Sequence, residues 1–575
     1  MVQVHLDLSD PQRHLVAVQI RLQPRLATMR LQLPGWTPGS YLIRDYVRQL
    51  ESLQVLQGSQ ALRLQRLGPS AWQLHCDPDG ADLQITYRVH ATELSVRTGH
   101  LDQDHGFLAL AAVILELEGE RWAPHHLSCT LPAGWQAFVP LPHGGTSWEA
   151  QDFDQLIDAP FEAGPHRDYP FSVFGVPHRL VVWAGAVGAE SWLMERYPQL
   201  LDDLRRTCEA CCQLMGVDAP ASADYLVVLH LLDEGFGGLE HDDSTVLVYG
   251  RSNLKKENGY RRFLQLVAHE YLHQWNVRRL RPAELTPIDY HQPPVVPSLW
   301  FAEGVTSYLD QFVPLSAGLS NADDLLIDLG EELSRFLLTP GRQVQSLRSS
   351  SQEAWVKLYK ADLYSPDSQV SYYLKGGVVA LCLDLHLRSN GSSLVDVLRG
   401  LWNSHGRWRR GYSEQDLLQA FANGAPDLAA LLPRWLEQVD DPDLDGYLDS
   451  VGLKIEAVMA HEPWAGMTTG IEANLLVATR VVRGGPAEQA GLMVGDELIA
   501  VDGQRLRCPE DLKGWLRSAQ RQELLISRRA QLRSLNLCCL APQVERYALK
   551  RDPAAAQTVL EQQSRWLMQQ ASVLP

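Results

Sequence analysis

Apolar and polar residues alternate along the first part of the chain, which is the pattern of β-strands that bury one face. Residues 16–22 place an apolar side chain at every second position, and residues 83–89 repeat this period. Turn-forming pairs such as Pro34-Gly35 and Pro38-Gly39 separate the apolar runs. The pattern predicts an N-terminal β domain of the sandwich type over residues 1–165.

From residue 166 onward, most apolar positions recur with the spacing of helices. The pattern predicts helices over Ser191–Leu214, Phe263–Leu280, Leu325–Leu338 and Tyr373–Arg388, and a strand over Tyr225–Leu232. We therefore expect a second domain over residues 166–445, with strands in its first half and helices in its second half.

A third unit is expected over residues 446–545. Residues 481–503 have the pattern of a strand, a short helix that ends at Gly491, a turn, another strand and a tight turn at Asp502-Gly503. The last segment, residues 546–575, is expected to be a helical tail, with its helix over Pro553–Gln570. Together these patterns predict a multidomain fold of the α+β class.

The composition is that of an ordinary globular protein and narrows the classes of partner. The chain has 575 residues, of which 45% are hydrophobic and 21% charged, and it is too long for one core. A net charge of −18 argues against nucleic acid or an anionic membrane as a main partner. No apolar run is long enough to span a bilayer, and the N-terminus lacks the pattern of a signal peptide.

The nine cysteines indicate free thiols rather than a disulfide framework. Cys208 and Cys211 have the spacing of half a metal or redox motif, but no second pair follows at ligand spacing. Both lie in a segment expected to be an amphipathic helix, where free cysteines usually pack as small apolar residues. Reduced cysteines are typical of the cytoplasm, so a cytoplasmic location is expected.

Residues 269–273 read His-Glu-Tyr-Leu-His and lie in a segment that is expected to be helical. On a helix, His269 and His273 share a face and can reach one metal ion. Neutral imidazoles are good zinc ligands, and Glu270 beside them can take a proton from a metal-bound water. The alternative is a helix that carries these residues by chance.

A second acidic element favours the metal site. Glu303 follows His273 by 30 residues (303 − 273), in the segment Leu299–Tyr308, which is expected to be another helix. A ligand set of His269, His273 and Glu303 leaves one position open for water or substrate, as in catalytic zinc sites. The expected cofactor is therefore Zn²⁺.

These motifs resemble the glycyl aminopeptidase family, zinc peptidases of the thermolysin-like, glutamate-liganded group. The resemblance rests first on residues 269–282 and 299–308. Three further segments agree with the family, in its order along the chain, and they are residues 33–46, 237–241 and 371–377. Residues 481–503 resemble a PDZ domain. The resemblance implies a thermolysin-like, mostly helical catalytic domain.

The resemblance also implies roles for individual residues. Glu270 is expected to act as general base and then as proton donor to the leaving amine. Tyr373, in a Tyr-x-Lys-Gly motif, is expected to donate a hydrogen bond to the oxyanion, with Tyr372 as the alternative. Asp310, seven residues after Glu303, is a candidate partner for the second nitrogen of a ligand histidine. His241 receives no role.

Glu240 is the residue expected to bear on specificity. An aminopeptidase must recognise a protonated α-amine, and Glu240 lies in the segment that resembles the substrate strand of related zinc aminopeptidases. Gly237 and Gly238 would let the substrate backbone approach that strand closely. In the alternative interpretation, the glycines form a flexible turn and Glu240 is solvated.

Two other segments keep two interpretations each. Residues 36–46 are either a packed β-turn or a wall near the active site. The PDZ-like unit either binds a peptide ligand or serves as a packing domain that shapes the cleft. Its candidate carboxylate-binding loop, residues 466–471, departs from the usual Gly-Leu-Gly-Phe type.

The expected function is a zinc-dependent aminopeptidase that removes N-terminal residues from peptides, and the resemblance implies a preference for glycine or other small residues. Two alternatives remain open. One is an endopeptidase with the same zinc chemistry, and the other is a non-catalytic PDZ protein that binds peptides. The presence of Glu270 and Tyr373 argues against a vestigial site.

Overall fold

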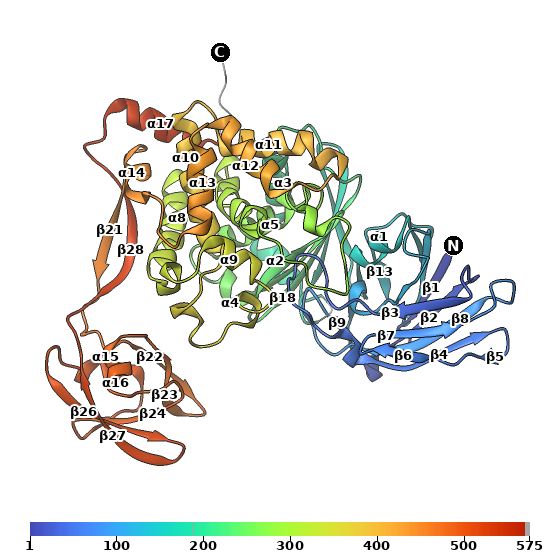
Figure 1. Cartoon of the computed structure of the whole chain (residues 1–575), viewed down its shortest axis with the longest axis horizontal. Coiled ribbons are helices and arrows are strands. Elements are labelled where there is room, and N and C mark those ends of the chain that lie inside the picture. Colours follow the sequence, from blue (N-terminus) through green and yellow to red (C-terminus); the bar gives the residue numbers. More distant parts are fainter. Residues whose placement is uncertain (187, 570–575) are drawn as a thin grey trace. The chain divides into compact units, whose positions relative to one another are not determined.

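The computed structural model describes residues 1–186 and 188–569. Its contacts divide the chain into two compact units. The first unit comprises Met1–Val296, Leu309–Ser320 and Val395–Ala420. The second comprises Pro297–Tyr308, Asn321–Leu394 and the described residues from Phe421 onward. Figure 1 labels many of the elements of both units.

The first unit opens with a seven-stranded sheet in which β1 pairs in parallel with β12 and antiparallel with β2. Along β2 every second residue is buried, as the alternation predicts. The strand order is β14 (Ser147–Ala150), β12 (His125–Thr130), β1 (Val2–Asp7), β2 (Leu15–Leu22), β8 (Leu83–His90), β4 (Leu50–Gln57) and β5 (Gln60–Ala61).

Two four-stranded sheets complete this β-rich part. One has the order β11 (Glu116–Leu117), β3 (Thr28–Gln32), β7 (Ala71–His75) and β6 (Gln65–Gly68). The other has the order β13 (Gln136–Phe138), β15 (Pro160–Gly164), β10 (Gly106–Ala109) and β9 (Gly99–Leu101). The β-rich start of the chain that the sequence predicts is therefore confirmed.

A five-stranded sheet follows in the same unit. Its order is β16 (Asp168–Val173), β17 (Val176–Trp183), β18 (Tyr225–Leu232), β20 (Ser244–Gly250) and β19 (Phe236–Glu240). Strand β18 lies between two parallel neighbours and is buried along nearly its whole length, which explains why its residues are apolar at every position except His230. Strand β19 is antiparallel and forms the edge of the sheet.

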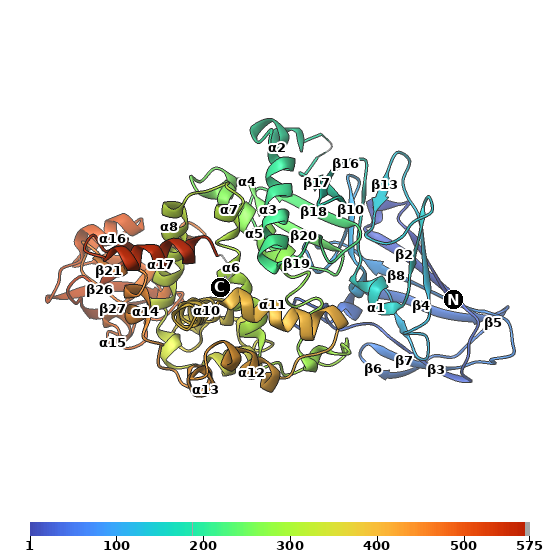
Figure 2. The same cartoon turned by 90° about the horizontal axis from the view of Figure 1, so that it is seen from above.

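Helices α3 (Leu200–Met215) and α5 (Gly259–Leu272) pack together beside this sheet (Figure 2). The prediction of one long helix over 191–214 is wrong, because this segment forms two helices. The chain forms α2 (Ser191–Arg196) and then α3, because Pro198 cannot continue a helix. The helix predicted over 263–280 starts earlier and ends at Leu272, after which the backbone N–H of Arg278 turns back to donate to the oxygen of His273.

The second unit contains most of the helices that follow. The π-helical segment η5 (Trp300–Val305) packs against α10 (Tyr372–Ser389). Helix α8 (Ala322–Leu337) packs against β28 (Val544–Arg551), which pairs antiparallel with β21 (Leu453–Met459). The predicted terminal helix is α17 (Gln557–Leu567), and the last position predicted for it, residue 570, lies outside the described residues.

The PDZ-like part of the second unit has its own core and its own sheet. The sheet order is β22 (Met467–Glu472), β23 (Leu475–Val481), β24 (Glu497–Val501), β26 (Arg521–Arg528) and β27 (Gln531–Cys538), with β25 (Gln504–Arg505) beside β24. Two short helices are α15 (Pro486–Gln489) and α16 (Pro509–Trp515). The loop predicted over 466–471 is shorter than expected, because the edge strand β22 begins at Met467.

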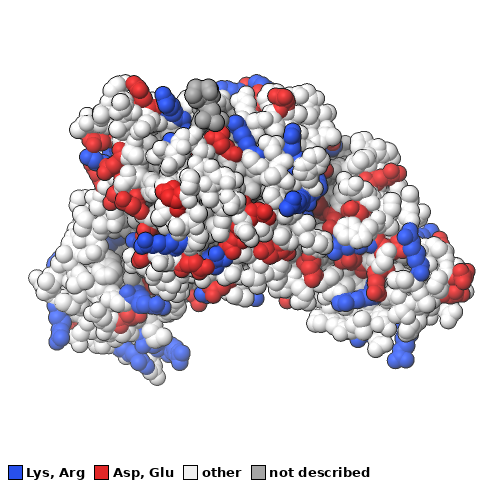
Figure 3. Space-filling model, turned by 45° about the horizontal axis from the view of Figure 1, so that its top comes forward, with Lys and Arg blue, Asp and Glu red and all other residues white. Residues whose placement is uncertain are grey.

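All nine cysteines lie in the described part of the chain and are free thiols, as predicted. Burial raises the pKa of the Cys208 and Cys211 thiols well above its usual value, which fits packed, unreactive side chains. Among the described helices, none combines the length and the apolar character needed to cross a membrane. The face in Figure 3 carries acidic and basic side chains interspersed with one another.

Candidate active site

Two histidines face one another at the end of α5. His269 lies in the last turn, and His273 directly follows the helix in right-handed helical conformation. Nδ1 of His269 lies 2.8 Å from Oδ2 of Asp310, and Nδ1 of His273 lies 2.5 Å from the backbone oxygen of Asn276. Both acceptors place the N–H on Nδ1, which leaves a lone pair on Nε2 of each ring. The contact that we predicted for Asp310 is present.

The Nε2 atoms of His269 and His273 lie 3.1 Å apart. Two neutral imidazoles with their N–H on Nδ1 cannot hydrogen-bond through Nε2, because both atoms are acceptors. Zn–N bonds of 2.0–2.1 Å in tetrahedral geometry would separate two nitrogen ligands by about 3.3–3.4 Å. The spacing of these two nitrogens therefore fits a shared metal ion of the zinc type.

Glu270 projects from α5 towards the glycine-containing strand β19. A Cβ atom at Gly238 would lie 2.2 Å from Oε1 of Glu270, so a glycine is needed to leave room for this carboxylate. Glu240 ends the same strand, and its carboxylate, that of Glu270 and the ring of His273 each place one atom within 4.8 Å of the others. The first unit thus brings together the predicted base, a predicted ligand and the predicted amine-binding residue.

Glu240 is only 4% exposed, and its Oε1 atom has no hydrogen-bond partner among the described residues. Gly39 of the N-terminal segment lies against it, since a Cβ at Gly39 would approach the two carboxylate oxygens to 2.5 and 2.6 Å. A small cavity at Glu240 is also lined by Trp36, Tyr41 and Arg278. Residues 36–41 therefore form a wall beside Glu240, and the interpretation of a solvated Glu240 is wrong.

In the second unit, Glu303 and Tyr373 lie on two helices that pack together. Glu303 is buried within η5, and π-helical turns of this kind are frequent at functional sites. The two helices can approach closely because residue 304 is a glycine. A Cβ at this position would come within 2.6 Å of the Gly376 backbone. Tyr373 lies in the first turn of α10, where the hydroxyl of Ser371 caps the helix.

The phenol of Tyr373 is protonated and can donate a hydrogen bond. Burial of the group, and then the nearby Glu303 carboxylate, raise the pKa of Tyr373 well above its usual value, so its hydroxyl keeps its proton. Its oxygen lies 3.3 Å from the hydroxyl of Tyr359. Tyr372 stacks on Tyr373 with ring centroids 4.8 Å apart and is fully buried, which favours Tyr373 over Tyr372 as the residue that faces substrate.

An ionic network around Arg278, which lies beside Glu240 in the first unit, was not predicted from the sequence. Arg278 donates to Asp158 over 2.6 Å and to Asp242 over 2.9 Å, and Arg409 donates to Asp242 over 2.6 Å. His241 belongs to this network, since its Nδ1 lies 3.2 Å from Asp158. The only local signal is the pair of arginines after the histidine motif, because the partners of Arg278 lie 36 and 120 positions away in the sequence.

Comparisons with known proteins identify three parts of the chain. Residues 3–165 match the family model described as the peptidase M61 N-terminal domain, residues 262–379 match that of the M61 glycyl aminopeptidase, and residues 477–529 match that of a PDZ domain. No protein in the curated collection matches the sequence. These matches confirm the family resemblance and the PDZ domain that the motifs predict.

Among solved structures, the chain is similar to an aminopeptidase N family protein from Idiomarina loihiensis, with a TM-score of 0.90 and 27% identity over 99% of this chain and 100% of that chain. An M1 zinc metallopeptidase from Deinococcus radiodurans has a TM-score of 0.48 and 15% identity, over 77% of this chain and 94% of that one. Leukotriene A4 hydrolase from Saccharomyces cerevisiae has a TM-score of 0.48 and 12% identity, over 78% and 70%. At such low similarity the last two say nothing further about this chain.

Proposed function

We propose that this chain, a metallo-aminopeptidase of the M61 type with a PDZ domain, is a zinc enzyme that removes N-terminal glycine or other small residues from peptides. The observation that carries the proposal is the buried carboxylate of Glu240, which has an oxygen without a hydrogen-bond partner in the described chain and lies beside Glu270 and His273. A buried anionic oxygen of this kind calls for a cationic ligand, and a peptide α-ammonium supplies one.

The metal would be held by His269, His273 and Glu303. The converging Nε2 atoms of the histidine pair support two of these ligands. Chain continuity supports the third, because Glu303 precedes Asp310 by seven residues of largely helical chain, about 10 Å along the axis, and Asp310 accepts from His269. Zinc bound by such a set polarises a carbonyl and makes a bound water more acidic.

The protein's own groups would carry the protons. Glu270, held over Gly238, would take the proton of the attacking water and pass it to the leaving amine. The hydroxyl of Tyr373 would donate a hydrogen bond to the oxygen on which negative charge develops. Gly237 and Gly238 would let the substrate backbone lie along the edge strand β19.

The preference for a small N-terminal residue is supported by the wall at Glu240. The cavity bounded by Trp36, Gly39 and Tyr41 has room for about one water molecule, so a large side chain would not fit on that side. The edge strand β22 of the PDZ domain supports a second peptide-binding site, because PDZ domains bind a peptide as an added strand. We also propose a cytoplasmic location, which the nine free thiols support.

The test is a panel of fluorogenic amides of glycine, alanine, leucine and phenylalanine, each with a free or an acetylated amine, assayed with and without chelator. We expect chelator-sensitive hydrolysis of the free amines, fastest for glycine and alanine. Equal rates for the free and acetylated amides would favour the endopeptidase. Absence of hydrolysis with zinc present, together with peptide binding by the PDZ domain, would favour the non-catalytic alternative.

A further inference from the structure

Three histidines and a glutamate form a second cluster, in the first unit and separate from the pair at the end of α5. Glu162 lies on β15, His230 lies on β18, and His105 and His166 flank β10 and β15. Glu162, His105 and His230 are 0% exposed, and His166 is 3% exposed. The cluster thus joins strands of the N-terminal domain to the central strand of the next sheet.

The donor atoms of the cluster converge on the Glu162 carboxylate. Nε2 of His230 lies 2.9 Å from Oε2, while Nε2 of His166 and Nε2 of His105 lie 3.0 and 4.0 Å from Oε1. One atom each of His105, Glu162 and His230 lies within 4.8 Å of the other two. Imidazole nitrogens and a carboxylate oxygen at this spacing form the type of ligand set that zinc and related transition metals take.

The cluster lacks a balancing charge among the described residues. The ion-pair partners of Glu162 are the three imidazoles, with no lysine or arginine among them. Both ring nitrogens of His105 and Nδ1 of His230 are buried without a hydrogen-bond partner in the described chain. A buried carboxylate without a counter-charge is expensive, and so are buried nitrogens without partners.

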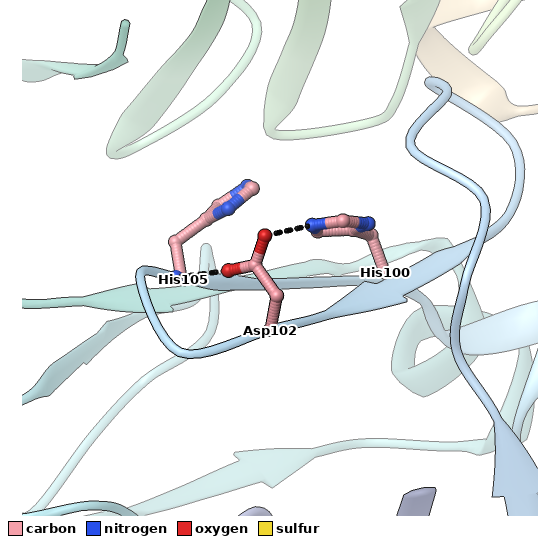
Figure 4. A group of neighbouring side chains, drawn as sticks. All are labelled: His100, Asp102 and His105. Atoms are coloured by element: carbon pink, nitrogen blue, oxygen red, sulfur yellow. Dashed lines mark hydrogen bonds and ion pairs between the residues drawn. The ribbon is translucent and has the colours of Figure 1, made fainter. Parts of the chain in front are cut away.

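A second carboxylate, that of Asp102, lies between His105 and His100 (Figure 4). Asp102 accepts the backbone N–H of His105 over 3.0 Å, and its Oδ2 lies 3.0 Å from Nε2 of His100. One atom each of His100, Asp102 and His105 lies within 4.8 Å of the others. Asp102 therefore fixes the backbone at His105 and holds the neighbouring ring of His100, while the ring nitrogens of His105 stay available to a ligand.

We propose that His105, Glu162 and His230 bind a second divalent transition-metal ion, of which zinc is the best match to the ligand types. The ion would supply the missing positive charge and would accept the lone pairs of His105 and His230. His166 lies against the carboxylate and is available as a fourth ligand. The bound ion would clamp β15 and the His105 segment onto β18, two strands from β19, which carries Glu240.

A proton is the alternative source of positive charge, but it satisfies less of the cluster. A protonated His230 would complete one ion pair with Glu162 and would leave both nitrogens of His105 without partners. The indole of Trp183 stacks on the His105 ring with centroids 4.4 Å apart, so that ring can make new bonds only through its edges. A metal ion at the edges of His105 and His230 serves both rings at once.

The first measurement is the zinc content of the full-length protein after gel filtration. We expect about two equivalents in the wild type, about one in the double variant His269→Ala/His273→Ala, and near zero when His230→Gln is added to that background. The double variant leaves the second cluster intact, and circular dichroism verifies its fold. In the same variant, Co²⁺ should give the visible absorption bands of a site with nitrogen and oxygen ligands, and chelator should lower the unfolding temperature.

A matched control is His125→Gln, since His125 is also buried in the N-terminal domain but bonds to a backbone carbonyl oxygen outside the cluster. This variant should keep the zinc content of its parent, while Glu162→Gln should lose one equivalent. The proposal is overturned if the wild type binds only one equivalent and the His269/His273 double variant binds neither zinc nor Co²⁺. Loss of catalysis alone would count against the aminopeptidase mechanism and not against the second site.

Discussion

Glu270 can lie over β19 because residue 238 is a glycine, and this contact places a carboxylate beside His273 and Glu240. We predict that Glu270→Gln keeps the fold and the zinc of the catalytic site but lowers turnover by about 10²–10⁴-fold, since the amide keeps the shape and cannot accept a proton. Steady-state kinetics and zinc analysis of the purified variant check this prediction. The exposed Glu257→Gln, just before α5, is the control and should behave as wild type. A Glu270→Gln enzyme with more than half of wild-type turnover would show that another group is the base.

Tyr373 and Tyr372 are stacked neighbours, so each is a control for the other. We predict that Tyr373→Phe lowers kcat by roughly 10²–10³-fold with little change in KM, because a hydrogen bond to the developing oxyanion acts mainly in the transition state. The fully buried Tyr372→Phe should retain most of the activity. The opposite result for the two variants would transfer the role to Tyr372.

The residues that could be predicted are those whose partners are close in sequence or whose spacing follows a helix. His269, Glu270 and His273 share one helix, and the helical spacing alone indicates that they converge. Arg278 could not be assigned in this way, because Asp158 and Asp242 approach it from segments far away in the sequence. The cluster around Glu162 could not be predicted for the same reason, since its histidines come from three separate segments.

At the scale of elements, the strand β18 was predicted with its observed bounds because a buried parallel strand is a nearly continuous apolar run, which only His230 interrupts here. Helix ends were harder to predict. The segment after Leu272 keeps apolar residues with helical spacing, yet it leaves the helix because side chains replace the backbone ladder, as when His273 binds the oxygen of Asn276. Such local competition for backbone oxygens does not show in periodicity.

The turn after α5 is held by Arg278, which joins it to Asp242 in the loop after β19 and to the last residue of the helix α1 (Phe153–Asp158). We predict that Arg278→Met destabilises the fold by about 3 kcal/mol, because the largely buried Asp158 loses its arginine, while Asp242 keeps Arg409. Urea unfolding followed by tryptophan fluorescence measures the effect. The control is Arg205→Met, which removes two ion pairs on the surface of α3, with Asp202 and Glu209, and should cost less than about 1 kcal/mol. Equal costs for the two variants would contradict the prediction.

The same network gives a dependence on pH with a definite sign. Burial alone would raise the pKa of Asp242, but Arg278 and Arg409 hold it well below its usual value. The pKa of Asp158 is also lowered, because Arg278 outweighs the effect of burial there. Groups with lowered pKa values stabilise the fold above their unfolded pKa, about 3.9, and this stability is lost as the pH falls below it. The wild type should therefore lose more stability than Arg278→Met between pH 5 and pH 3.

At the scale of the whole molecule, the order of the three parts could be predicted because each has its own sequence period and its own motif. Contacts between segments could not. Asp367, only 3% exposed, accepts from Arg480 of the PDZ domain over 3.1 Å within the second unit, and neither residue stands out in the sequence. In the first unit, Gly39 reaches Glu240 from about 200 residues away in the sequence, so the specificity site is built by two parts of the chain.

Because two parts of the chain enclose Glu240, this residue can distinguish removal of a terminal residue from cleavage inside a chain. If Glu240 pairs with the substrate α-ammonium in a closed site, the charge-assisted contact contributes about 1.5–3 kcal/mol. We predict that Glu240→Gln lowers kcat/KM for free-amine substrates by roughly ten- to a hundredfold, since about 1.4 kcal/mol is tenfold. It should change little for N-acetylated peptides, which lack the ammonium and should already be poor substrates. Glu234→Gln, an exposed residue just before the same strand, is the matched control and should keep wild-type kinetics. A uniform loss on free and acetylated substrates would mean that Glu240 supports the fold of the site rather than reading the amine, and the endopeptidase alternative would then gain.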